Sequence, residues 1–303
     1  METTAVRSTP SAERRTEKTS WVLLAFGVLA ASFSAILVRY AQGADPLAIS
    51  FWRCAAGAAA LMPFAARRLR HMTPRALAAS VVAGAFLAMH FATWITSLQL
   101  TSVASAVLLV TASPIFVAAM DRGIFGRRLS GAGWLGIAGS VLGSALVVGG
   151  DFRGDSLLGD GLAVAGCVAV SVYTLAGREA RREVGVLEYA SVAYAVAAVL
   201  LLASCTVAGA GLTGYDATTW WAIAGLAAGP QLLGHTVINL ILKHIDATTV
   251  SVAVMGEPVL ATILAFFLFS ETPTAWFYPG AVAILWGIWT VSRATRPDPV
   301  VPE

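Results

Sequence analysis

The sequence carries, at residues 247–269, the stretch ATTVSVAVMGEPVLATILAFFLF, in which Glu257 is the only charged residue. A helix that crosses the apolar core of a bilayer needs about 20 residues, so this stretch is long enough to span a membrane. It lacks the strict alternation of polar and apolar residues that a β-barrel strand shows. A spanning segment that satisfies its own backbone hydrogen bonds is then a helix.

Nine further apolar runs occupy most of the remaining chain. They cover residues 21–38, 47–66, 76–98, 102–120, 130–149, 157–177, 187–208, 218–242 and 274–292. The sequence therefore predicts an all-α integral membrane protein with ten transmembrane helices. Residues 1–19 are polar and mixed in charge, which is typical of a disordered tail. Residues 294–303 form a second tail.

The composition excludes several classes of protein. Of 303 residues, 57% are hydrophobic and 12% are charged, whereas soluble domains carry roughly a quarter charged residues. A soluble enzyme is excluded. The net charge of +3 is spread over many loops, so nucleic acid is not an expected partner. Cys54, Cys167 and Cys205 lie in separate apolar runs without a metal-type spacing, and neither a metal nor a cofactor is expected.

The distribution of Lys and Arg predicts the orientation in the membrane. Seventeen of the 20 lie in the two tails and in alternate loops, whereas only Arg39 and Arg153 lie on the other side and Arg53 lies within a run. Cytoplasmic loops carry the excess of positive residues. We therefore expect a multi-pass protein of the bacterial inner membrane with both termini in the cytoplasm.

The chain also shows an internal repeat. The matched pairs are Ser32 with Ser171 and Arg39 with Arg178 at a shift of 139, His90 with His235 at 145, and Pro114 with Pro258, Gly136 with Gly280 and Gly143 with Gly287 at 144. We interpret residues 20–150 and 151–293 as two five-helix halves. Because five is odd, the halves enter the membrane in opposite orientations, and such inverted repeats place a transport site between them near the midplane.

Several stretches resemble a known family. They are PLAISFWRCAAG at residues 46–57, SAVLLVTASPIFVAAM at 105–120, SVAVMGEPVLATILAFFLFSETPT at 251–274 and the glycine pairs of the fifth and tenth helices. Together they are similar to two EamA domains of the drug/metabolite transporter superfamily. The resemblance implies an exporter of amino acids, other metabolites or drugs, and not an enzyme. The first repeat has Ser113 where the second has Glu257, so the halves are not expected to contribute equally.

Two charged residues lie well inside apolar runs, where such residues usually face a cavity or a partner. Glu257 is near the middle of its run and is a candidate for coupling transport to a proton. Alternatively, its carboxyl bonds the backbone that Pro258 frees. Arg53 lies roughly 10 Å deep and either contacts the cavity, snorkels to the headgroups or forms an ion pair. Pro114 and Pro258 are candidate helix breaks or hinges, or else static kinks.

Other polar side chains are candidates for the wall of a substrate cavity. On the third and eighth helices they are His90, Trp94, His235 and Asn239, and on the first and sixth they are Ser32, Ser171, Tyr173 and Thr174. Imidazole, indole and amide groups on matching faces suit an amphiphilic solute. The alternative is that they bond neighbouring helices together.

These features favour a carrier that exports small amphiphilic metabolites by alternating access. Amino acids, aromatic ones included, are the first candidates, and other metabolites or drugs are the alternative. An integral membrane enzyme or a lipid flippase is the alternative of another class. The expected partners are a small-molecule substrate and the lipid bilayer, without nucleic acid and without an obligatory protein partner.

The topology can be tested with reporter fusions. We expect fusions at Asp155 and Gly214 to be active only as periplasmic enzymes. Fusions at Arg128 and Arg182 should be active only as cytoplasmic ones, because those loops carry the positive charge. A reversed pattern at any of the four sites would contradict the topology.

Overall fold

The computed structural model describes residues 10–148, 156–270 and 272–295, and all regular elements in these ranges are helical. The elements are α1 (Pro10–Tyr40), α2 (Pro46–Leu69), α3 (Pro74–Leu100), α4 (Val103–Thr111), α5 (Ser113–Phe125), α6 (Gly131–Val148), α7 (Leu157–Arg181), α8 (Val186–Ala208), α9 (Ala217–Leu226), the π-helix η1 (Ala227–His235), α10 (Thr236–Ile241), α11 (Ala247–Val254), α12 (Glu257–Phe269) and α13 (Phe277–Ala294). The all-helical fold is confirmed.

Eight helical stretches of the described chain are long and apolar enough to cross a membrane, judged by length and composition. The expected runs at 218–242 and 274–292 are not among them. The first is divided into α9, η1 and α10, and the second forms α13, which is as long as α6 but less apolar, with several aromatic residues and Arg293. A multi-pass membrane protein follows from these helices, while the number of ten spans stays a prediction.

The ends of the chain differ in part from the expected tails. Helix α1 already begins at Pro10, so it includes residues 10–19 of the expected first tail. Residues 1–9, and residues 296–303 of the second tail, lie outside the described residues.

Side-chain caps explain where many helices begin. A cap accepts a hydrogen bond from a backbone N–H that has no partner inside the helix. The capping residues are Asp45 for α2, Thr73 for α3, Ser102 for α4, Ser156 for α7, Asp216 for α9 and Asp246 for α11. Each lies in a polar connection just before an apolar run, so the sequence fixes these starting points locally.

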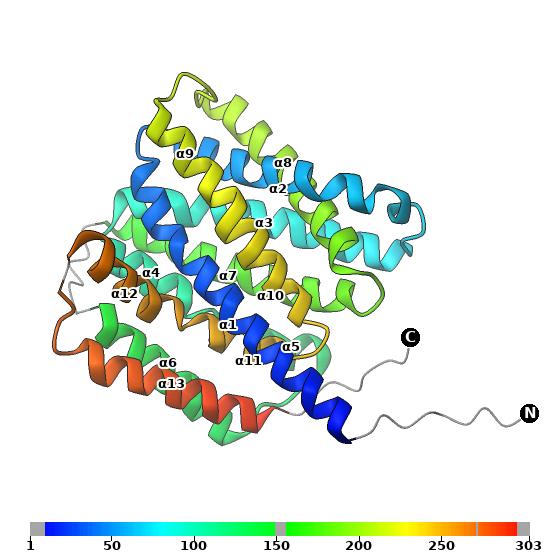
Figure 1. Ribbon diagram of the computed structural model, residues 1–303, viewed down its shortest axis with the longest axis vertical. Helices are drawn as coiled ribbons and strands as arrows, with labels where there is room; N and C mark the ends of the chain where they lie inside the picture. Colours follow the sequence, from blue (N-terminus) through cyan, green and yellow to red (C-terminus); the bar gives the residue numbers. More distant parts are fainter. Residues whose placement is uncertain (1–9, 149–155, 271, 296–303) are drawn as a thin grey trace, which may run out of the picture.

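Helices α6 and α13 lie side by side through four glycines (Figure 1). A Cβ atom on Gly143 would lie 2.7 Å from the carbonyl oxygen of Gly280, and one on Gly136 would lie 3.0 Å from that of Gly287. The early glycine of each helix faces the late glycine of the other, so the helices run antiparallel. Only glycine permits this approach of the two backbones.

Glycines also bring two further pairs of helices close together. Helix α1 packs against η1 and α10, and α7 packs against α3. The shift of 139 relates Gly27 of α1 to Gly166 of α7. A Cβ atom on Gly166 would lie 3.3 Å from the Cβ of Trp94, and one on Gly27 would lie 3.1 Å from Cγ1 of Ile238. Both glycines therefore mark a close crossing with a helix of the other half, which is what a two-fold relation between the halves produces.

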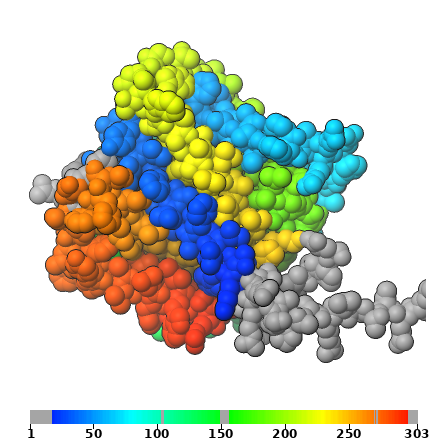
Figure 2. All heavy atoms as spheres, viewed as in Figure 1, coloured from blue at the N-terminus to red at the C-terminus, as the bar shows by residue number. Residues whose placement is uncertain are grey.

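These contacts correct the register that the histidines suggested. They pair Trp94 with Ile238 at a shift of 144, so His235 is the counterpart of Phe91 and not of His90. The capping residues Thr73 and Asp216 differ by only 143. One extra residue therefore enters the second helix, and the wider π-helical turn of η1 accommodates it. Figure 2 shows α1 and η1 running beside each other across the molecule.

A buried ion pair lies at one end of the bundle. We expected Arg178 in a loop, but it lies in the last turn of α7 and is 1% exposed. Its Nη1 and Nη2 atoms donate to the two carboxylate oxygens of Asp121 in α5, at 2.9 and 2.8 Å. Such a bidentate pair fixes the angle between two side chains as well as their distance, and here it ties the two halves together.

The glycine contacts can be tested by substitution. Gly287→Ala should lower the free energy of unfolding by about 1–3 kcal/mol, because its Cβ would collide with the backbone oxygen of Gly136. The matched control is Gly161→Ala in α7, where a Cβ meets nothing within 4 Å and should stabilise the helix by roughly 0.5–1 kcal/mol. Apparent melting temperatures of the purified proteins measure both effects. Equal shifts would contradict the close packing.

Candidate functional site

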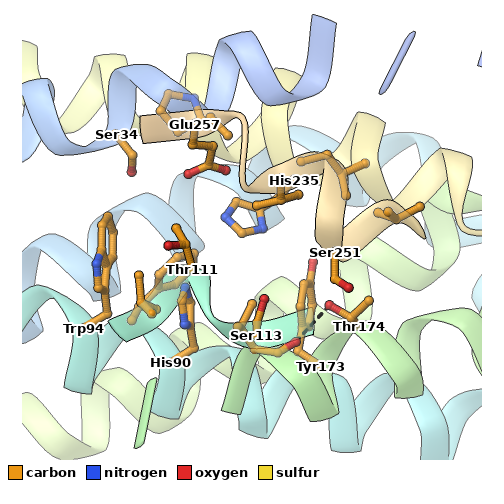
Figure 3. Close-up of a pocket in the computed structure, with 18 residues that line it drawn as sticks. Ser34, His90, Trp94, Thr111, Ser113, Tyr173, Thr174, His235, Ser251 and Glu257 are labelled. Carbon is orange, nitrogen blue, oxygen red and sulfur yellow. Dashed lines mark hydrogen bonds between the residues drawn. The ribbon is translucent and has the colours of Figure 1, made fainter. Parts of the chain in front are cut away.

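A cavity of about 90 Å³ lies between the two halves (Figure 3). Its wall comes from α1, α3, α4, α5, α7, η1, α10, α11 and α12. The polar and aromatic residues that line it are Ser34, His90, Phe91, Trp94, Thr111, Ser113, Tyr173, Thr174, His235, Ser251 and Glu257. The cavity thus joins hydroxyl groups, rings and one carboxyl in the interior of an otherwise apolar protein.

Two helix breaks lie at this cavity. Helix α5 restarts at Ser113 and α12 restarts at Glu257, each followed by a proline in the first helical turn. Proline is tolerated there because its missing N–H would have no partner in the helix anyway. The expectation that Pro114 and Pro258 mark breaks agrees with this geometry, although the prolines themselves do not line the cavity.

The carboxyl group of Glu257 points into the cavity (Figure 3). Within the described chain no hydrogen bond or ion pair joins it to another residue, so the alternative of a bond to the freed backbone does not occur. Ser113, its repeat counterpart, lies in the opposite wall in Figure 3. The second half alone supplies an ionisable acid to the cavity.

Aromatic rings form much of the remaining wall. The rings of His90 and Trp94 are stacked at 5.9 Å, and His235 lies edge-on to Phe91 at 5.3 Å and to Tyr173 at 6.0 Å. Nδ1 of His90 is 2.9 Å from the carbonyl oxygen of Gly166. A carbonyl only accepts, so Nδ1 carries a proton. The structure therefore places both histidines in the wall of the same cavity.

Arg53 lies behind this wall and not in it. It is 0% exposed, donates from Nε to Oε1 of Gln231 at 3.0 Å and from Nη1 to Oγ of Ser34 at 3.3 Å. The guanidinium carbon lies 3.9 Å from the centroid of the Phe91 ring. The snorkelling alternative is wrong, because the side chain points into the protein and not to a membrane surface.

Three further candidates are buried beside the cavity and do not line it. Asn239 donates from Nδ2 to the hydroxyl of Tyr173, so it positions a residue of the wall. The hydroxyl of Ser32 donates to the carbonyl of Val28 at 2.7 Å, and that of Ser171 donates to the carbonyls of Cys167 and Ser113. Asn239 does not line the cavity because the two halves match at a shift of 144 in this region. At this shift Ile238, and not Asn239, is the counterpart of Trp94.

Sequence reasoning missed several lining residues, namely Ser34, Phe91, Thr111, Pro230 and Ser251. Serines and threonines give no signal in an apolar helix, because they pack helices as often as they bind solutes. Pro230, in contrast, did offer a signal in the sequence. A proline inside an apolar run interrupts the backbone hydrogen bonds, and here it lies within the π-helix at the cavity.

The fold and the cavity define a multi-pass membrane protein whose two similar halves enclose a polar and aromatic site. The model of the EamA-like transporter family matches residues 19–149 and 157–293, so the chain belongs to this family as two EamA repeats. The crystal structure of another protein is 20% identical in sequence to this chain, with a TM-score of 0.77, and the match covers 92% of this chain and 99% of the other. That likeness shows the fold alone. No curated protein matches the chain.

Cysteine labelling tests the wall of the cavity. The native cysteines are buried and would first be replaced by alanine. We expect His90→Cys and His235→Cys to react with a small polar thiol reagent, because both residues line the cavity. The control Asn239→Cys should stay unmodified, since Asn239 is 1% exposed. Equal labelling at positions 235 and 239 would contradict the register of η1.

Proposed function

We propose that the protein is a carrier that exports small amphiphilic metabolites across a bacterial inner membrane by alternating access. Ten spans, with residues 20–150 and 151–293 as the repeats and both termini in the cytoplasm, complete the proposal. The observation that carries it is the cavity between the halves at two matched helix breaks. Interrupted helices at corresponding places are the usual construction of a transport site.

Amino acids are the first candidates for the substrate. The rings of Phe91, Trp94 and Tyr173 offer apolar contacts, and the hydroxyls and the carboxyl of Glu257 offer hydrogen-bond acceptors. A pocket with mostly apolar walls and a few placed polar groups suits a small amphiphile. Other metabolites and drugs with an amine and an aromatic ring fit the same description and are the second candidates.

Counterflow in proteoliposomes tests the proposal. Purified full-length protein would be preloaded with each member of a panel of amino acids and amine-bearing drugs, and entry of the labelled solute would be measured. We expect saturable exchange that the unlabelled solute inhibits, and none in protein-free liposomes. Exchange with no solute of the panel would contradict the proposed substrate classes.

The same proteoliposomes test coupling at Glu257. We propose that this carboxyl binds and releases a proton as access changes. Glu257→Gln cannot release a proton, so it should retain counterflow at saturating solute and lose accumulation driven by a pH gradient. The control is Glu188→Gln in the first turn of α8, a buried carboxyl paired with Arg68 that does not line the cavity. If accumulation by the wild type does not depend on the pH gradient, Glu257 has no role in proton coupling.

A further inference from the structure

Arg53 is a buried cation whose counter-charge is not in contact with it. All of its hydrogen bonds go to neutral groups, and in the described part of the chain no carboxylate lies within ion-pair distance. Its Nη2 atom and the neighbouring Nε2 atom of Gln231 make no hydrogen bond at all. A buried charge without a compensating charge is strongly unfavourable, so the compensation must come from a group farther away.

Glu257 supplies this compensation. It is the carboxyl in the wall of the cavity behind which Arg53 lies, and within the described chain no hydrogen bond or ion pair gives it a partner of its own. Ser34 and Phe91 belong both to the wall of the cavity and to the contacts of Arg53. The two charges are therefore held apart, one in the wall and one directly behind it.

In the state in which the carboxyl of Glu257 has released its proton, the charges around the cavity sum to zero. Glu257 is the only acid in the wall, and Arg53 is the cation behind it. Protonation of His90 or His235 would add a second buried cation near Arg53, so we treat both imidazoles as neutral. A solute with a net charge would leave that charge uncompensated in a medium of low dielectric constant. A solute with no net charge would preserve the balance.

We propose that Arg53 and Glu257 form a separated charge pair that selects the net charge of the bound solute, so that the cavity prefers a zwitterion to a cation or anion of the same shape. The inference rests on the proposed function in one respect, namely that this cavity is where the solute binds. Arg53 acts on the solute through its electric field and through its hydrogen bond to Ser34, which lines the cavity. Glu257 acts by direct contact with the solute.

Three probes with the same phenyl ring and different charges test the proposal. They are phenylalanine with no net charge, phenethylamine with one positive charge and 3-phenylpropionate with one negative charge. Their binding to the purified full-length protein in detergent at pH 7 would be measured by titration calorimetry. We expect the wild type to bind phenylalanine about ten-fold or more tightly than either charged probe.

Charge substitutions should move this preference in opposite directions. Glu257→Gln leaves an excess positive charge and should make 3-phenylpropionate the best of the three probes. Arg53→Gln leaves an excess negative charge and should favour phenethylamine, whereas Arg53→Lys keeps the charge and should keep the wild-type order. Glu188→Gln is the matched control for loss of a buried carboxyl, and its order should not change. If Arg53→Gln does not fold, the shift in Glu257→Gln decides the question alone.

Several outcomes would overturn the proposal. An unchanged order in Glu257→Gln would mean that the pair does not select charge, and so would equal binding of a charged probe by the wild type. Absence of binding by all three probes would also overturn it. If another solute still exchanges in counterflow, the proposed function survives that result. If the order shifts as expected but no solute exchanges, the charge pair stands and the proposed function fails.

Discussion

A helix in a bilayer can be interrupted only where a cavity or neighbouring protein groups satisfy the freed backbone. The breaks before Ser113 and Glu257 agree with this constraint, because both residues line the cavity. A proline in the first turn of each new helix fixes the position of the break. The positions of the two breaks therefore determine where polar side chains can lie together in the membrane. The remaining helices enclose this region.

Close packing between the halves brings the two breaks together. The four glycines of α6 and α13 let two backbones approach, and α5 packs against α11. A bulky residue at Gly143 or Gly280 would separate α6 from α13. Neither helix lines the cavity, so these glycines act on the packing of the two halves and not directly on the site.

The sequence predicted the features that depend on local chemistry. The apolar runs predicted the helices, and Pro114 and Pro258 were candidates for the breaks that precede α5 and α12. It did not predict the π-helix, because an extra residue in a turn leaves the apolar pattern unchanged and Pro230 marks only an interruption of backbone hydrogen bonds. That extra residue decided which of two neighbouring candidates, His235 or Asn239, lines the cavity. The position of Arg53 along its helix also could not show that its side chain lies behind Phe91. That arrangement depends on contacts between helices that are distant in the sequence.

The backbone of the two halves follows a two-fold relation, but the charges do not. Arg178 is buried against Asp121, while its counterpart Arg39 is exposed. Glu257 is matched by the neutral Ser113. In a carrier whose halves exchange conformations, identical halves would give two access states of equal energy. Here the Arg178–Asp121 pair joins the halves at one end of the bundle only, and Glu257 has an uncharged counterpart, so in such a carrier the two states would differ in energy even without a solute. Under the proposed function, an ion or a solute that binds Glu257 would change that difference, which is what coupling requires.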